Sequence, residues 1–451
     1  MRDKKYDAII VGAGLAGLSC AYELSSRGKK VLVVEKQAYA GGRTSSFIDN
    51  SMQVESGLHR YIGYYSALPK LLKKCGVKIG DIVTWEEKVD ILIKDENKKL
   101  ILGLAPLFAP VKTLRGIFGN HDILSVKDKL SLIEFFICGF SSYIFSENLD
   151  HYSIAEYANK HGVSEKSKRL VLEPLSSGIF FLPPENYSAY AFFGLFAPAI
   201  PKFYKMRIGA FLGGMTDVMC NPIVGKIKSL GGDFIFSKEI SEVIYKNNTV
   251  TGVESTDGDC FYADNIVIAT TLSAAKDILE PLKNHKSLDK LFSLKTMSAC
   301  TFQLELNKPA LKKDITTFAP GTDMVSFAEQ SRSTFRNTKG RLSVILGNPK
   351  EYSNKSAEVI LEIVKKQMSS LGVHLDDSIT NYRKVAEEDE FYSLDKGSQK
   401  LRPTQKTEID GLILAGDYTL TSSFATMEGA VISGKKAAKI CLDNKQYIVG
   451  Q

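Results

Sequence analysis

The chain has little of what marks several protein classes. It contains 1 Trp, 14 Pro and 7 Cys in 451 residues, and no two cysteines form a Cys-x-x-Cys pair. An odd number of widely spaced cysteines supplies neither a disulfide framework nor a zinc site of the usual spacing. We therefore predict reduced thiols, a cytoplasmic protein and no bound metal.

Long runs of one chemical character are also missing. The sequence has no block of five or more Lys or Arg, although 58 Lys+Arg against 51 Asp+Glu give a net charge of +7. A small, scattered excess argues against nucleic acid as the partner and suits a membrane surface. Arg2, Lys4 and Lys5 precede an apolar run as in a signal peptide, but the glycines inside that run favour a folded segment.

The amino terminus carries a strand, a glycine-rich turn and a helix in that order. An apolar run at 6–11 leads into Gly12-Ala13-Gly14-Leu15-Ala16-Gly17, and a second run at 30–34 ends in Glu35. This order is typical of a dinucleotide site: the glycines allow a tight turn, approach of the backbone to a pyrophosphate and packing of helix on strand. Glu35 is placed for ribose hydroxyls. The alternative is an ordinary glycine turn without a ligand.

A second glycine motif follows Glu35. Gly41-Gly42-Arg43-Thr44 completes the pattern E-x5-G-G-R. It resembles the extended signature of the flavoprotein superfamily that includes amine oxidases, protoporphyrinogen oxidases and carotenoid desaturases. The resemblance implies FAD as the cofactor, with Arg43 near its phosphates or flavin. A solvated loop cation is the alternative reading of Arg43.

Residues near the carboxy terminus point to a smaller group within this superfamily. An apolar strand at 411–415 ends in Gly416-Asp417, and a run of small residues at 425–435 would begin a closely packed helix. Together with the segments 55–59, 210–214, 227–232 and 400–406, these residues look like the blocks of phytoene and ζ-carotene desaturases in the same order. The match extends over nearly the whole chain.

Transferred residue by residue, the resemblance implies a set of FAD contacts but no catalytic residue. His59 takes a flavin-contact role in this set, and Val243, within a cluster of short strands at 234–269, reaches the adenine through its backbone. The predicted cofactor-binding residues are Gly12, Ala13, Gly14, Leu15, Ala16, Gly17, Glu35, Lys36, Gly42, Arg43, Thr44, Leu58, His59, Tyr65, Val243, Gly416, Asp417 and Met427.

The predicted fold is α/β, with a discontinuous Rossmann-type FAD-binding domain and an interleaved α+β substrate domain. The first comprises 1–77, 205–285 and 401–451, and the second comprises 78–204 and 286–400. The segments 101–118, 130–145 and 189–200 are rich in apolar residues but interrupted or too short for a spanning helix of about 20 residues. We expect them to line an elongated apolar pocket, to enter one membrane leaflet, or both. The alternative is a buried helical core with solvated basic ends.

The function these patterns favour is FAD-dependent desaturation or dehydrogenation of an apolar isoprenoid, with hydride transfer to the flavin and electrons passed to a quinone or oxygen. One departure concerns Ala199, which stands where plant-type phytoene desaturases have an Arg; Lys202 and Arg207 are candidates to replace it. The alternatives are a protoporphyrinogen oxidase, a squalene-type dehydroxylase, a flavoprotein acting as a lipid carrier or complex subunit without turnover, and an amine oxidase. An amine oxidase needs an aromatic cage, for which Tyr418 and Phe424 are the candidates.

Overall fold

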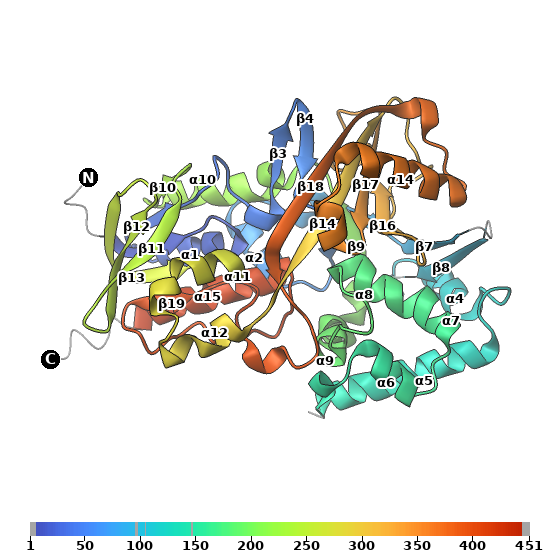
Figure 1. Cartoon of the computed structure of the whole chain (residues 1–451), viewed down its shortest axis with the longest axis horizontal. Helices are drawn as coiled ribbons and strands as arrows, with labels where there is room; N and C mark the ends of the chain where they lie inside the picture. Colours follow the sequence, from blue (N-terminus) through green and yellow to red (C-terminus); the bar gives the residue numbers. More distant parts are fainter. Residues whose placement is uncertain (1–5, 95–97, 104, 146–147, 444–451) are drawn as a thin grey trace.

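The computed structural model describes residues 6–94, 98–103, 105–145 and 148–443. Arg2, Lys4 and Lys5, which the sequence analysis weighed as part of a signal peptide, lie outside these ranges. Two sheets of seven strands dominate the described chain, and a layer of helices lies at the end remote from the chain termini (Figure 1).

The first sheet gathers strands from three distant parts of the chain. Its parallel portion has the order β10-β2-β1-β13-β19, and β12 and β11 extend it antiparallel from β13. The strands are β1 (Tyr6–Val11), β2 (Val31–Val34), β10 (Asp233–Ile235), β11 (Ile240–Lys246), β12 (Thr249–Ser255), β13 (Cys260–Ile268) and β19 (Leu412–Leu414). Val, Ile and Leu dominate the central strands because helices cover both faces of a parallel sheet.

Two helices from opposite ends of the chain pack on this sheet. α1 (Leu15–Ser25) follows β1, and α15 (Met427–Asp443) follows β19. A Cβ on Gly434 would lie 2.0 Å from the carbonyl oxygen of Ala16, so the two backbones meet without a side chain between them. The Ser19 hydroxyl also donates to the Val431 carbonyl at 2.9 Å. The predicted strand, helix and strand at the amino terminus and the predicted small-residue helix near the carboxy terminus are confirmed.

The second sheet is mainly antiparallel, with the order β18-β14-β17-β16-β15-β7-β8. Its strands are β7 (Lys88–Ile93), β8 (Lys98–Gly103), β14 (Thr296–Leu306), β15 (Thr317–Phe318), β16 (Met324–Glu329), β17 (Gly340–Leu346) and β18 (Ile379–Tyr392). The parallel pair β15–β7 joins the two parts of the chain that build it. α14 (Ala357–Ser370) buries Ile360, Val364 and Met368 in the core formed with this sheet.

A helical layer follows β8 in the sequence. It contains α4 (Pro110–Phe118), α5 (Val126–Ile144), α6 (Ile154–Lys160), α8 (Glu173–Phe180), α9 (Ala189–Phe196) and the 3-10 segment η4 (Ala197–Lys205). Ser125 and Asp128 form a capping box that begins α5. Phe135 of α5 packs against Phe193 of α9, with ring centroids 5.2 Å apart. Within the ranges that the structure describes, none of the helices could cross a bilayer.

Two small sheets connect the layers. β3 (Ser46–Asp49) and β4 (Met52–Glu55) form a hairpin, and β5 (Tyr61–Ile62), β9 (Ile208–Phe211) and β6 (Val83–Glu86) form a three-stranded sheet. The loop from β4 to β5 carries the predicted residues Leu58 and His59. This short connection therefore lies between two paired strands, which hold both of its ends.

Candidate active site

A cavity of about 800 Å³ is lined by residues of both large sheets and of the helical layer. One part of its wall comes from the carboxyl ends of strands in the first sheet, at Gly12, Glu35, Ala269 and Gly416. Ligands bind at this edge in open parallel sheets. The other part is mainly apolar and includes Val89, Leu175, Ile179, Phe180, Phe181, Leu195, Phe196, Ile208, Phe318 and Val385. The cavity thus joins a nucleotide-type edge to an apolar chamber.

Glycine is required in the turn between β1 and α1. Gly12 has a φ of 101°, and a Cβ on it would lie 2.9 Å from the carbonyl oxygen of Ala269. A Cβ on Gly17 would lie only 2.0 Å from the carbonyl oxygen of Gly12. Gly14 caps α1 without a side-chain hydrogen bond, which leaves the first-turn N–H groups for an anionic ligand.

Glu35 ties this turn to the end of β2. Its Oε2 accepts from the Ala13 N–H at 2.6 Å, and its Oε1 accepts from the Gln37 N–H at 2.9 Å. Burial raises the pKa of Glu35, and the two backbone donors oppose that rise. Gly41 closes the other side of the turn by donating its N–H to the Ala13 carbonyl at 3.0 Å. The acid therefore organises the phosphate-binding turn while lining the cavity.

Arg43 and Asp417 bring the two ends of the chain together. Arg43 Nη2 lies 2.5 Å from Asp417 Oδ1. The Arg43 guanidinium also lies over the Phe391 ring, 4.6 Å from its centroid. Burial opposes the charge of Arg43, but Asp417 outweighs that effect and raises the pKa of the guanidinium. The alternative reading of Arg43 as a solvated loop cation is therefore wrong, because Arg43 is paired with Asp417 at the cavity wall.

His59 on the cavity wall and Glu55 behind it form an uncharged pair. His59 Nδ1 lies 3.1 Å from the Gly57 carbonyl oxygen, and the ring also has a hydrogen bond with the backbone of Arg43. The same nitrogen is 4.0 Å from Glu55 Oε2. Burial lowers the pKa of His59 to about 4 and raises that of Glu55 to about 8. At neutral pH the imidazole is neutral and the carboxyl is mostly protonated.

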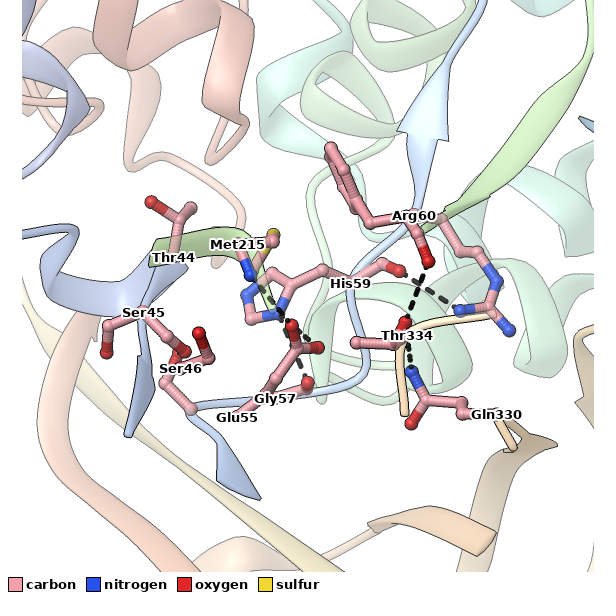
Figure 2. A network of polar contacts seen from close by, with 12 residues as sticks. Thr44, Ser45, Ser46, Glu55, Gly57, His59, Arg60, Met215, Gln330 and Thr334 are labelled. Atoms are coloured by element: carbon pink, nitrogen blue, oxygen red, sulfur yellow. Dashed lines mark hydrogen bonds and ion pairs between the residues drawn. The ribbon is translucent and has the colours of Figure 1, made fainter. Parts of the chain in front are cut away.

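Backbone and side-chain contacts fix this pair. Figure 2 shows the His59 ring directed towards Glu55 and Met215, with the Arg60 guanidinium on the far side of the His59 backbone. The Met215 N–H donates to Glu55 Oε1 at 3.3 Å. Gln303 donates through Nε2 to the Glu55 carbonyl at 2.5 Å and accepts through Oε1 from the Glu55 N–H at 3.3 Å. The loop before β5 is thus anchored to the second sheet.

Most of the predicted cofactor contacts lie on the cavity wall. They are Gly12, Gly14, Leu15, Ala16, Glu35, Lys36, Gly42, Arg43, Thr44, Leu58, His59, Tyr65, Gly416, Asp417 and Met427. Ala13 and Gly17 support the turn from behind through Glu35 and Gly12. Val243 lies in the middle of β11 and is not on the cavity wall. The residues that line the cavity here are Lys238, Glu239 and Ile240, at and just before the start of β11. The contact at Val243 stays a prediction.

β18 supplies wall residues that the sequence analysis did not identify. Glu387, Glu390, Phe391 and Tyr392 line the cavity. Burial raises the pKa of Glu387 to about 7, and the nearby Glu390 adds to the rise. The Tyr392 hydroxyl accepts from the Ala425 N–H at 3.0 Å, which joins β18 to the start of α15. The four consecutive acids at 387–390 could have indicated a functional segment, because acidic residues are depleted from ordinary strands.

Of the other residues weighed in the sequence analysis, only Arg207 lines the cavity. Tyr418 and Phe424, the candidates for an aromatic cage, are buried and absent from the cavity wall. Ala199 is buried in η4, and Lys202 donates to the Tyr64 carbonyl at 3.4 Å. Arg207 lines the cavity, but its guanidinium stacks on Trp85, 3.6 Å from the ring centroid. The replacement of the missing Arg by Lys202 or Arg207 stays a prediction.

The prediction that no metal is bound stays a prediction. Among the described residues, Glu134, Cys138 and His161 place potential ligand atoms within 4.8 Å of one another. Glu134 and Cys138 lie on α5, and His161 directly follows α6. None of the three lines the cavity, so the group is separate from the site described above.

The residues of the nucleotide-type edge suit a dinucleotide. Unpaired N–H groups at the start of α1 suit a pyrophosphate, and the Glu35 carboxylate suits ribose hydroxyls. Arg43 and Asp417 add a fixed cation and anion between this edge and the apolar chamber. Fold and site together define a dinucleotide-dependent oxidoreductase of the Rossmann type.

Comparison with known proteins identifies the family to which this oxidoreductase belongs. Residues 15–442 match the family of flavin containing amine oxidoreductases, and the chain belongs to that family. The protein is therefore an FAD-dependent oxidoreductase. The predicted superfamily, the α/β fold and the FAD cofactor are confirmed.

The similar sequences match nearly the whole length of this chain. The chain is 26% identical to the 15-cis-phytoene desaturase of Synechococcus elongatus over 95% of its own length and 94% of that protein. It is also 26% identical to a probable zeta-carotene desaturase of the same organism, over 96% and 98% of the two chains. The 15-cis-phytoene desaturase of Solanum lycopersicum is 26% identical, over 99% of this chain and 79% of that protein.

Solved structures share the fold at lower identity. A putrescine oxidase bound to putrescine superimposes with a TM-score of 0.75 at 15% identity, over 98% of this chain and 99% of that one. A putative protoporphyrinogen oxidase from Exiguobacterium superimposes with a TM-score of 0.70 at 15% identity, over 98% and 100% of the two chains. These likenesses establish the fold alone.

Proposed function

We propose that the protein desaturates or dehydrogenates a long apolar isoprenoid. The observation that carries the proposal is the continuity of the cavity, in which the FAD-type edge opens into the apolar chamber formed by α8, α9, β15 and β18. Relatives that match nearly the whole chain are phytoene and ζ-carotene desaturases, which supports an isoprenoid with conjugated or isolated double bonds. When bound, FAD supplies the hydride acceptor.

In this proposal the chain's own residues mainly position the ligand and exclude water. Leu175, Ile179 and Phe180 of α8 and Phe318 of β15 bury the apolar substrate. The His59 ring places no charge at the wall, because burial lowers its pKa to about 4. Desaturation would transfer a hydride from one carbon to the flavin and release a proton from the neighbouring carbon to water or to the reduced flavin. We assign no side chain as the base for this proton.

We assign FAD contacts to the predicted residues and retain the two-domain division. The strands of the first sheet come from 1–77, 205–285 and 401–451, and those of the second come from 78–204 and 286–400. This distribution supports the proposed boundaries. Glu35 would bind the ribose, the α1 turn would bind the pyrophosphate, and Arg43, His59, Asp417 and Met427 would surround the flavin end.

The same proposal includes contact with a membrane surface. Exposed apolar side chains gather on α4, α5 and η4 and on the residues beside them: Leu107, Phe108, Val111, Leu114, Val126, Leu130, Ile133, Ile137, Ile144, Phe145, Ile200, Phe203 and Tyr204. Arg115, Lys127 and Lys205 lie among them and would face anionic headgroups. An apolar substrate dissolved in a bilayer would enter here, and electrons would leave to a quinone or oxygen.

An amine oxidase is the less favoured function. The fold is shared with putrescine oxidase, but Tyr418 and Phe424 are 1% and 2% exposed and cannot form a cage at the cavity wall. The chamber wall presents mainly aliphatic and Phe side chains. Tyr418 and Phe424 therefore cannot replace the hydration that a cationic amine would lose on binding.

Anaerobic mixing tests the proposal. The FAD-loaded full chain is mixed with phytoene in detergent micelles, or with putrescine in the same micelles, and the yellow flavin absorbance is followed. We expect phytoene or a related polyene to bleach the flavin and putrescine to leave it yellow. Rapid bleaching by soluble amines alone would overturn the proposal.

A further inference from the structure

Arg60 is a cation in the wall of the apolar chamber with one donor left over. Its Nε lies 2.6 Å from Glu86 Oε1 and donates to Thr316 Oγ1 at 2.9 Å. Its Nη1 donates to the His59 carbonyl at 3.1 Å. The remaining nitrogen, Nη2, is buried and has no hydrogen-bond partner within the described chain. The Arg60 side chain is only 10% exposed, and that of Glu86 is 2% exposed.

Several neighbours of Arg60 face the same cavity. Arg60, Ile62, Ile208 and Thr316 all line it, although Glu86 does not. Glu86 and Ile62 are both register partners of Ile208, on β6 and β5 respectively, so the ion pair lies beside the apolar wall. Glu86 also accepts from the Thr316 N–H at 2.7 Å, which fixes the carboxylate. The guanidinium is therefore held in place. Nη2 has almost no accessible surface of its own, so a ligand oxygen reaches it only by displacing a neighbouring side chain of the wall.

The unpaired Nη2 donor favours an apolar ligand that carries an oxygen over a pure hydrocarbon. A hydrocarbon packed against Nη2 would leave a buried charged N–H unsatisfied, which is strongly unfavourable. A carbonyl or hydroxyl oxygen would satisfy it. Because Glu86 already balances the charge of Arg60, a neutral oxygen is sufficient and a full anion is not required.

We propose that Arg60 Nη2 binds an acceptor oxygen, a carbonyl or a hydroxyl, on an otherwise apolar ligand in this chamber. The inference rests on the proposed function, because it takes an apolar ligand as given. The oxygen has two possible sources, which are an oxygenated end of the isoprenoid substrate and the carbonyl of a quinone acceptor. In either case Arg60 is a specificity-determining residue and takes no part in hydride transfer.

Two variants and one control isolate the donor. Arg60→Lys keeps a cation opposite Glu86 but removes the fixed guanidinium fork. The double variant Arg60→Met, Glu86→Gln removes the whole ion pair without leaving a lone buried charge. Arg332→Lys changes an arginine that pairs with Asp314 away from the cavity and serves as the matched control.

The experiment measures binding to the FAD-loaded full chain by the change in flavin absorbance. The first probe pair is geranylgeraniol and the same chain without its hydroxyl. The second pair is decylbenzoquinone and decylbenzene. For the wild type and Arg332→Lys we expect at least one oxygenated probe to bind roughly 10- to 100-fold more tightly than its hydrocarbon partner, the preference typical of a hydrogen bond to a charged group. In both Arg60 variants we expect this preference to fall to about threefold or less.

The outcomes separate the two sources and the two proposals. A preference in the alcohol pair assigns the oxygen to a substrate, and one in the quinone pair assigns it to the electron acceptor. Equal binding within both pairs by the wild type, or a preference that survives in both Arg60 variants, would overturn the assignment to Arg60. Polyene bleaching without any preference defeats this inference alone, whereas a preference without polyene bleaching defeats only the proposed function.

Discussion

Arg43 Nη2 and Asp417 Oδ1 lie 2.5 Å apart, although the two residues are separated by 374 positions in the sequence. The contact joins the loop after the glycine turn to the end of β19, and both residues line the cavity. The packing of α1 on α15 behind them brings the same two ends of the chain together. Formation of the cofactor site is therefore coupled to folding of the whole chain.

The substitution Asp417→Asn should weaken FAD binding. It leaves Arg43 buried without its charge partner, and hydrogen bonds to charged groups contribute about 1.5–3 kcal/mol. We expect roughly 10- to 100-fold weaker FAD binding, measured by the recovery of free-flavin fluorescence on dilution. Asp410→Asn, at an exposed aspartate before β19, is the control. Unchanged affinity in Asp417→Asn would show that the pair does not hold the cofactor site together.

The substitution Gly17→Ala should disrupt the turn from behind. The added Cβ would lie 2.0 Å from the Gly12 carbonyl oxygen, so α1 must move away from β1. Overpacking of this kind destabilises proteins by about 1–3 kcal/mol. We expect purified protein with little FAD and a lowered Tm. Gly80→Ala, where nothing lies within 4 Å of the new Cβ, should retain both the FAD and the Tm of the wild type.

Glu55 should make the protein less stable as the pH rises. Burial raises its pKa from 4.5 to about 8, so the folded chain retains a proton that the unfolded chain has lost. The stability from this group is complete below about pH 4.5 and is lost as the pH rises towards and through about 8, by up to roughly 1.4 kcal/mol per pH unit.

Glu55→Gln mimics the protonated carboxyl and tests this dependence. We expect thermal unfolding at pH 8.5 to show a Tm roughly 2–4 °C above that of the wild type, with little difference at pH 5. The control Glu242→Gln changes an exposed glutamate of β11 and should leave the Tm unchanged at both pH values. An equal effect of Glu55→Gln at both pH values would mean that Glu55 does not titrate in this window.

The exposed apolar side chains of α4 and α5 should matter for membrane contact and not for FAD binding. Val111 is 76% exposed and Ile137 is 65% exposed. The double variant Val111→Glu, Ile137→Glu should sediment with anionic phospholipid vesicles at least about tenfold less than the wild type, because two apolar side chains that would enter the membrane become negatively charged. Val359→Glu, at a 49% exposed position on α14, is the control. Equal sedimentation of all three proteins would contradict the membrane proposal.

The local parts of the site were predictable from the sequence because short-range backbone geometry fixes them. Gly12 and Gly17 occupy positions where a Cβ would collide, and Glu35 meets Ala13 at the end of the next strand. Asp417 was found because a glycine and an acid follow an apolar strand. In each case the sequence pattern and the three-dimensional constraint lie within about one strand–turn–helix unit.

The remainder depends on contacts between distant segments. In the sequence, nothing distinguishes Arg60 from an ordinary loop arginine. Its ion pair with Glu86 depends on the position of β6 in the folded chain. Glu55 becomes a buried acid only because Met215 and Gln303 approach it from two other parts of the chain. The wall residues of β18 were assigned to the substrate domain by position, and no periodicity could show that this strand also borders the flavin-type edge.

The most direct test of the central claim is the stoichiometry of the anaerobic reaction with a polyene. One equivalent of FAD-loaded protein is mixed with phytoene, the reduced flavin is measured by absorbance, and the polyene is analysed by mass spectrometry. We predict that each flavin reduced is matched by one polyene that has lost two hydrogen atoms. Flavin that stays oxidised with every polyene but is reduced by an amine or a porphyrinogen would contradict the account.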